Sequence, residues 1–129
     1  MKTKSPILPE RLRKVPKHFS WLDHRLVRDR HIEACSHPAA ALYLLLVTAG
    51  DAMGLSYYSD ASIMKRLSMD PATLAGAREN LIRIGLIAWR KPLYQVLSLD
   101  EPHPDGPRQA KAKPLSLAEI LKKAAGGAP

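Results

Sequence analysis

The fold is decided by residues 70–99, which read DPATLAGARENLIRIGLIAWRKPLYQVLSL. Asp70 followed by Pro71 is a favourable helix start, because aspartate caps the first turn and proline suits the first helical position. Apolar residues then recur three or four positions apart, at Leu74, Ala77, Leu81 and Ile84. The pattern predicts a helix over residues 71–84 that buries this side. It ends at Gly85, which permits a tight, left-handed exit.

Two apolar runs follow that glycine and predict a β-hairpin. They cover Leu86–Arg90 and Leu93–Leu99 and are separated by Lys91 and Pro92. Short apolar runs joined by about two residues are typical of hairpins, although the proline leaves the turn type open. The aromatic residues of the two runs favour cross-strand packing over a stacking platform for single-stranded nucleic acid.

The residues before position 70 predict further helices and one short strand. Residues 38–49 begin with proline and are almost wholly apolar, which is typical of the central helix of a domain. Residues 55–58 predict a short strand, and residues 61–67 predict a helix capped by Ser59 or Asp60. Further upstream, residues 19–22 predict a short strand or an apolar anchor, and residues 23–30 one or two helical turns.

The chain therefore divides into four parts. We predict a basic extended arm over residues 1–17, a folded domain over 18–99, a flexible linker over 100–114 and a short amphipathic helix over 115–126.

The order of the predicted elements resembles that of winged helix-turn-helix DNA-binding domains. Residues 73–87, where a helix runs into Gly-Leu-Ile, are similar to many bacterial regulators, and residues 58–63 resemble the start of their preceding helix. Residues 19–23 and the leucine-rich run resemble the amino-terminal domains of plasmid and phage replication initiators and of DnaD-like primosome proteins. The resemblance covers about half of the chain and implies a mainly α fold with a small β wing (α+β).

The same resemblance implies a duplex DNA-binding accessory or regulatory protein of a bacterial replication, mobile-element or transcription system. In such proteins the second helix of the helix-turn-helix enters the major groove, and the wing reaches the flanking backbone. The expected DNA contacts within the domain are Lys65, Arg66, Thr73, Arg78, Asn80, Arg83, Arg90 and Lys91.

Base readout by the reading helix is expected to be modest. Its predicted outward positions are Ala72, Thr73, Ala75, Gly76, Glu79 and Asn80. Only Thr73 and Asn80 resemble base-reading residues, and Glu79 repels phosphate unless it accepts a hydrogen bond from cytosine. We therefore expect binding mainly through the DNA backbone and shape.

The charge distribution favours a polyanionic partner. The chain carries a formal net charge of +8. Residues 1–17 hold six Lys or Arg against one Glu, a net charge of +5, whereas residues 18–99 carry only +2. Neutralising phosphates with such an arm releases counterions, so further contacts are expected from Arg11, Arg13, Lys14 and Lys17. The alternative is a solubilising tail.

A second class of function remains open, a winged-helix adaptor between proteins. The Ala/Gly-rich face of the reading helix and the apolar stripe of residues 115–126 are also suited to packing against a protein partner. A homodimer is open as well, because many winged-helix regulators are dimers, although neither tail carries a sustained heptad repeat.

No motif indicates an enzyme or a cofactor. The sequence lacks a glycine-rich phosphate loop, a nucleophile elbow and a carboxylate cluster suited to two metals. His31, Cys35 and His37 are too few for a structural zinc site and have no paired cluster, so we expect no metal.

Compartment signals favour the cytoplasm. Cys35 is the only cysteine, which excludes an intrachain disulfide. We see no secretory signal and no apolar stretch near the ~20 residues that span a bilayer. The expected location is therefore cytoplasmic and nucleoid-associated, without a membrane partner.

Overall fold

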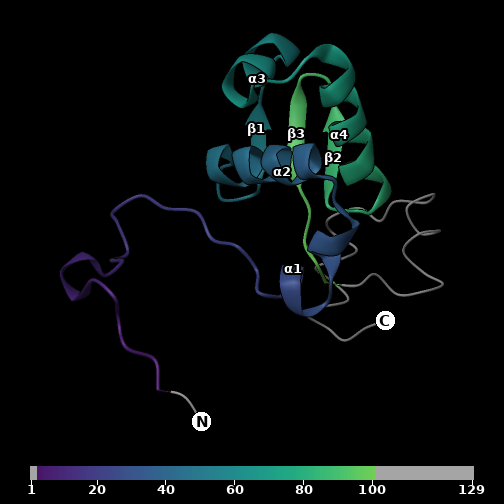
Figure 1. Cartoon of the computed structure of the whole chain (residues 1–129). Helices are drawn as coiled ribbons and strands as arrows, with labels where there is room; N and C mark the ends of the chain where they lie inside the picture. Colours follow the sequence, from purple (N-terminus) through teal and green to yellow (C-terminus); the bar gives the residue numbers. More distant parts are fainter. Residues whose placement is uncertain (1–2, 101–129) are drawn as a thin grey trace, which may run out of the picture. The chain divides into compact units, whose positions relative to one another are not determined.

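The computed structural model describes residues 3–100 and shows a mainly helical α+β fold (Figure 1). The described α-helices and strands are, in chain order, α1 (Arg25–Arg28), α2 (His37–Ala49), β1 (Leu55–Tyr57), α3 (Asp60–Leu67), α4 (Pro71–Arg83), β2 (Ile87–Arg90) and β3 (Leu93–Val96). Single 3-10 turns lie at Pro9–Arg11 and His31–Ala34. This is a winged-helix-like layout, and it confirms the predicted fold class.

The contacts within the chain define two units, Met1–Ser98 and Leu99–Pro129. The helix predicted over residues 115–126 lies outside the described residues, as does almost all of the predicted linker over 100–114. None of the helices in the described part is long and apolar enough to cross a membrane.

The three longer helices begin at side-chain caps. The Ser59 hydroxyl accepts from the Ser62 N–H at 3.1 Å, and the Asp70 carboxylate accepts from the Thr73 N–H at 2.7 Å. The Ser36 hydroxyl caps α2 by accepting from the Ala39 N–H at 3.2 Å. Each cap satisfies an amide that has no partner inside the helix. The predicted starts of α3 and α4 are thereby confirmed to within one residue.

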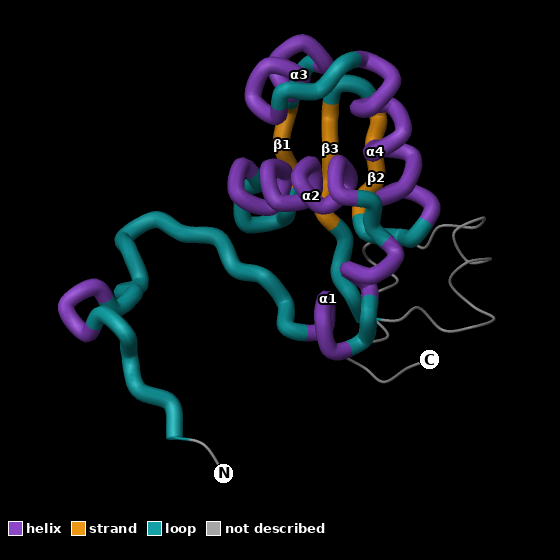
Figure 2. The backbone as a smooth tube through the Cα atoms, viewed as in Figure 1, coloured by secondary structure: helices purple, strands orange, loops and turns teal. Residues whose placement is uncertain are grey.

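The three strands form one antiparallel sheet in the order β1-β3-β2, with β3 in the middle. Tyr94 of β3 pairs with Ser56 of β1 on one side and with Trp89 of β2 on the other. Helix α2 crosses one face of this sheet (Figure 2). The predicted hairpin is confirmed, but β3 ends at Val96 and not at Leu99.

The core lies between α2, α3, α4 and the sheet. Its large, fully buried side chains are Leu42, Leu46, Ile63, Leu74, Leu81, Leu86, Ile87 and Tyr94. The predicted burial of Leu74, Ala77 and Leu81 is confirmed. The predicted burial of Ile84 is wrong, because α4 ends at Arg83 and Ile84 lies half-buried in the turn that follows.

Two glycines have left-handed backbones that the turns require. Gly85 has φ +80°, a backbone conformation that favours glycine. A Cβ added at this residue would have no heavy atom of the described residues within 4 Å, so glycine is needed for its conformation and not for lack of space. Gly54 has φ +82°, and an added Cβ would lie 2.8 Å from the Val96 carbonyl oxygen. The predicted left-handed exit from α4 is confirmed.

The segment before α1 differs from the prediction. Residues 19–22 form no strand, and Phe19, Trp21 and Leu22 are 62%, 73% and 51% exposed. They are therefore not a buried anchor either. Only one α-helical turn follows, α1, and of its two apolar residues Leu26 is buried and Val27 is exposed.

Candidate nucleic-acid interface

Several of the DNA contacts expected from the sequence belong to elements at one end of the folded domain. In Figure 1 the turn between β2 and β3, helix α3 and the first turn of α4 lie at the same end of the sheet. The Tyr58 N–H donates to the Pro92 carbonyl oxygen at 3.1 Å, which ties the turn to the residues that precede α3. The wing is therefore short and fixed.

Four cations occupy this end, which we call the basic end: Lys65 and Arg66 from the last turn of α3, Arg90 from the end of β2, and Lys91 from the β2–β3 turn. All four residues are exposed. Within residues 3–100 none of their side chains makes a hydrogen bond or an ion pair. They are free to meet an anion in solution.

Two carboxylates stand near the basic end, and both have partners. Asp60 pairs with Arg78 at 3.0 Å. Hydrogen bonds from the Thr73 side chain and backbone lower the pKa of Asp70, which therefore stays ionised as the cap of α4. Because this carboxylate already accepts from the Thr73 N–H, the helix terminus does not offer that amide to a phosphate.

The structure corrects the predicted role of Arg78. Arg78 is only 8% exposed. The guanidinium donates to Asp60 Oδ1 at 3.0 Å and to the Tyr94 hydroxyl at 2.8 Å, and it lies 3.8 Å from the centroid of the Trp89 ring. Arg78 thus faces inward, because Tyr94 and Asp60 offer it hydrogen bonds and Trp89 a cation–π contact. It is not available to DNA.

The Arg78 network joins four elements by charge-assisted contacts. Burial lowers the pKa of Arg78, but hydrogen bonds to Tyr94 and Asp60 outweigh it and leave this pKa raised. For Tyr94, burial raises the pKa, so the Tyr94 hydroxyl stays protonated. The Trp89 and Tyr94 rings pack with centroids 6.1 Å apart, as expected for cross-strand aromatics. The network therefore holds the wing against α3 and α4.

Asn80, predicted as an outward base reader, is also turned inward and is 7% exposed. Its Oδ1 accepts from the Ser36 N–H at 2.7 Å, and its Nδ2 donates to the Ala34 carbonyl at 3.0 Å. The amide satisfies two backbone groups just before α2, which explains why it leaves the helix surface. The predicted outward position of Asn80 is wrong.

The outward face of α4 is consequently poor in hydrogen-bonding side chains. It presents Ala72, Ala75, Gly76, Glu79 and Ile82, all exposed. Thr73 is half-buried in the first turn. Arg83 is exposed but occupies the last residue of α4, roughly 18 Å along the helix from Pro71 at a rise of 1.5 Å per residue. It lies away from the basic end.

Gly76 has no structural need to be glycine. It lies inside α4, and an added Cβ would have no heavy atom of the described residues within 4 Å. Because glycine weakens a helix interior, we expect Gly76→Ala to raise the free energy of unfolding by about 0.5–1 kcal/mol. Urea unfolding measures this, with Ala75→Gly as the matched control that lowers stability by a similar amount. A destabilised Gly76→Ala variant would contradict the open space seen at this position.

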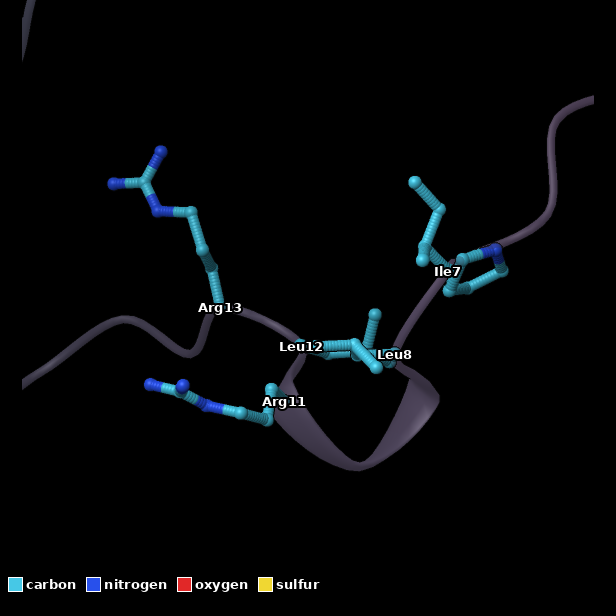
Figure 3. Close-up of a pocket in the computed structure, with 6 residues that line it drawn as sticks. Ile7, Leu8, Arg11, Leu12 and Arg13 are labelled. Atoms are coloured by element: carbon cyan, nitrogen blue, oxygen red, sulfur yellow. The ribbon is translucent and has the colours of Figure 1, made fainter.

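The basic arm is exposed along its described length. Lys4, Arg11, Arg13, Lys14 and Lys17 form no ion pair within the described residues. The 3-10 turn Pro9–Arg11 makes an open, shallow hollow, where Arg11 and Arg13 extend to the same side (Figure 3). The hollow is lined by Pro6, Ile7, Leu8, Arg11, Leu12 and Arg13. The hollow has a volume of about 500 Å³ but is open to solvent, unlike the clefts that bury most of a bound small ligand.

Residues 3–100 contain no group of three or more His, Cys, Asp or Glu side chains arranged to hold a metal. Cys35 is half-buried, and its thiol lies 3.7 Å from the His31 carbonyl oxygen. Burial raises the pKa of the Cys35 thiol, which disfavours the thiolate that a nucleophile requires.

Comparison of the chain with models of protein families, with curated proteins and with solved structures gives no significant match. The interface is accordingly defined by its own residues.

Proposed function

We propose that this chain binds duplex DNA through the phosphate backbone, with the basic end and the arm of residues 1–17 as its contacts. The observation that carries the proposal is the basic end itself, four exposed cations without partners in the described part, set beside the start of α4. Phosphate contacts position a protein on DNA and do not depend on sequence.

The inward positions of Arg78 and Asn80 support a binder that reads shape more than bases. Asn80, one of the two α4 residues that resemble base readers, and Arg78, another expected contact, are engaged within the fold, and the second such residue, Thr73, is half-buried. What α4 leaves outward is small or apolar apart from Glu79 and Arg83, and such residues supply few donors to base edges. We therefore infer an accessory or regulatory role with low sequence preference.

The test is duplex binding measured by fluorescence anisotropy between 50 and 200 mM salt. The four cations of the basic end alone contribute a log–log slope of about −3.6, a fall in affinity on the order of 100-fold over this range, and contacts from the arm make the slope steeper. Deleting residues 1–17 should bring the slope back towards about −3.6. Absence of binding at 50 mM salt, or an affinity indifferent to salt, would remove the proposal.

A protein-adaptor function is the second candidate, and the outward face of α4 is the observation that favours it. Ile82 is 42% exposed on this helix beside small residues. An adaptor predicts that Ile82→Gln weakens capture of a protein partner, whereas backbone binding predicts an unchanged duplex affinity. Truncation before residue 115 tests separately whether the predicted C-terminal helix takes part in partner capture.

A further inference from the structure

The antiparallel sheet has an outer face as well as the inner face that packs in the core. Side chains alternate between the two faces along each strand, and residues paired across strands share a face. The inner face carries Trp89 and Tyr94, because Arg78 of α4 lies over the Trp89 ring and bonds the Tyr94 hydroxyl. The register then places six residues on the opposite face, which we call the outer face: Leu55, Tyr57, Ala88, Arg90, Leu93 and Gln95.

The outer face is one contiguous surface, because the strand pairing sets its six residues in two adjoining rows. One row crosses the sheet from β1 to β2 through Tyr57, Leu93 and Arg90, and the other three residues pair in the row beside it. Neighbouring strands lie about 4.8 Å apart, so each row is about 10 Å wide. Four of the six residues are exposed and the two leucines are half-buried. The described residues therefore leave this face open.

Tyr57 is the aromatic residue of the outer face and is 74% exposed. Within the described residues its hydroxyl makes no hydrogen bond, and its ring packs on no other ring or cation. The other aromatic residues of the sheet, Trp89 and Tyr94, are engaged on the inner face. Tyr57 thus adds nothing to the core and presents a free ring to solvent. Such a ring is a surface on which a nucleobase stacks.

Polar groups that suit the rest of a nucleotide lie beside this ring. Arg90 belongs to the same row as Tyr57, and Lys91 follows it in the turn. Neither cation makes an ion pair within the described residues, so both can hold a phosphate. Gln95 lies exposed in the next row, and its amide can donate to and accept from the edge of a base.

Acidic groups do not oppose a polyanion on the outer face. None of its six residues is Asp or Glu. Asp60, three residues after Tyr57, pairs with Arg78 of the inner side at 3.0 Å. Asp51 precedes the end of β1 away from Tyr57, and its carboxylate accepts from two N–H groups of its own turn at 2.8 and 2.9 Å. The charge at the Tyr57 end of the face is therefore positive.

We propose that the outer face binds a single strand of nucleic acid, with one base stacked on Tyr57 and the adjacent phosphates held by Arg90 and Lys91. An unpaired strand exposes the faces of its bases to an aromatic side chain, whereas the bases of a duplex are stacked on one another. Tyr57 thus selects for unpaired bases, which contacts to the duplex backbone do not. The inference extends the proposed function, with which it shares the two cations, but Tyr57 belongs to this site alone.

Fluorescence anisotropy of the full chain with oligothymidylate and oligouridylate of about 15 nucleotides at 50 mM salt tests the proposal. We expect Tyr57→Ala to lower the affinity for the strand that binds more tightly about 5- to 150-fold, the loss of one stacked base. Tyr57→Phe keeps the ring and should stay within about twofold of wild type. The affinity for a blunt duplex should change by less than about twofold in both variants.

Two further variants separate the stacking from the phosphate contacts. Phe19→Ala is the matched control, because Phe19 is also an exposed aromatic residue, at 62%, but lies outside the sheet. It should leave the affinity for single strands unchanged. Arg90→Ala with Lys91→Ala should reduce the slope of log affinity against log salt by about 1.4, because each phosphate contact of a single strand contributes about 0.7.

Photochemical crosslinking supplies a measurement on the unaltered chain. A strand that carries 5-iodouracil becomes attached on irradiation to an aromatic side chain stacked on that base, and we expect the attached peptide to contain Tyr57. Absence of single-strand binding, wild-type affinity in a natively folded Tyr57→Ala variant, or an equal loss in Phe19→Ala would overturn the assignment. Single-strand binding that depends on Tyr57, found without duplex binding, would remove the proposed function and still support this site.

Discussion

Replacing the four residues of the basic end by alanine together is expected to reduce duplex affinity on the order of 10³-fold at 0.1 M salt. Each lost phosphate contact removes about 0.9 from the slope of log affinity against log salt, so the slope should shrink by about 3.6. The reason is counterion release, which these exposed side chains provide because nothing in the described residues neutralises them. Anisotropy titrations at four salt concentrations measure both quantities.

Two double variants divide the effect between α3 and the wing. Lys65→Ala with Arg66→Ala, and Arg90→Ala with Lys91→Ala, should each lower affinity by tens of fold and each reduce the slope by about 1.8. Because all four side chains are exposed, none of these changes should alter thermal stability appreciably.

A control variant that removes the same number of positive charges elsewhere distinguishes direct contact with DNA from the effect of the net charge of the protein. Arg83→Ala combined with Arg30→Asn also removes two positive charges, at residues outside the basic end. Asparagine is chosen at position 30 because Arg30 has a left-handed backbone, φ +64°. If the control lowers affinity as much as either double variant, the basic end is not the contact surface.

The backbone of the domain was predictable because its signals are local. The Asp70 cap, the spacing of Leu74, Ala77 and Leu81, and the left-handed Gly85 all act within a few residues of sequence. Cap preference, helical periodicity and the conformational freedom of glycine are enough to place α4 and the turn after it.

The candidate site was less predictable because its decisive contacts join distant residues. Arg78 donates hydrogen bonds to Asp60 and Tyr94, which lie 18 and 16 positions away in sequence. Asn80 donates to the Ala34 carbonyl oxygen, 46 positions away. Sequence places such side chains on a helix but does not show which polar group meets them. The one available signal for an inward Arg78 is Tyr94, whose hydroxyl lies in the predicted hairpin and can accept a hydrogen bond.

Some apolar residues were expected to be buried but are exposed in the structure. Phe19, Trp21 and Leu22 suggested an anchor, because apolar side chains favour burial. In the structure they remain exposed beside α2. A hydrophobic segment in sequence indicates surface that favours burial, but it does not indicate whether the same chain or a second copy covers it.

Arg78→Met is expected to lower the free energy of unfolding by about 2–4 kcal/mol, the largest effect on stability that we predict for a single substitution. The change keeps most of the side-chain volume but leaves the buried Tyr94 hydroxyl without its hydrogen bond and Trp89 without its cation. The lost ion pair with Asp60 adds less to this destabilisation, because the Asp60 side chain is 46% exposed and water solvates it. Urea unfolding followed by Trp89 emission and by circular dichroism measures the loss.

Arg78→Lys and Arg83→Met show which property of the arginine matters. Lysine keeps the charge but not the planar group that stacks on Trp89, so an intermediate loss is expected. Arg83→Met alters an exposed arginine of the same helix and should change stability by less than about 0.5 kcal/mol. Tyr94→Phe combined with Arg78→Met should cost clearly less than the two separate losses added together, because both remove the same hydrogen bond. If Arg78→Met unfolds within the error of wild type, the inward arginine does not hold the wing to α4.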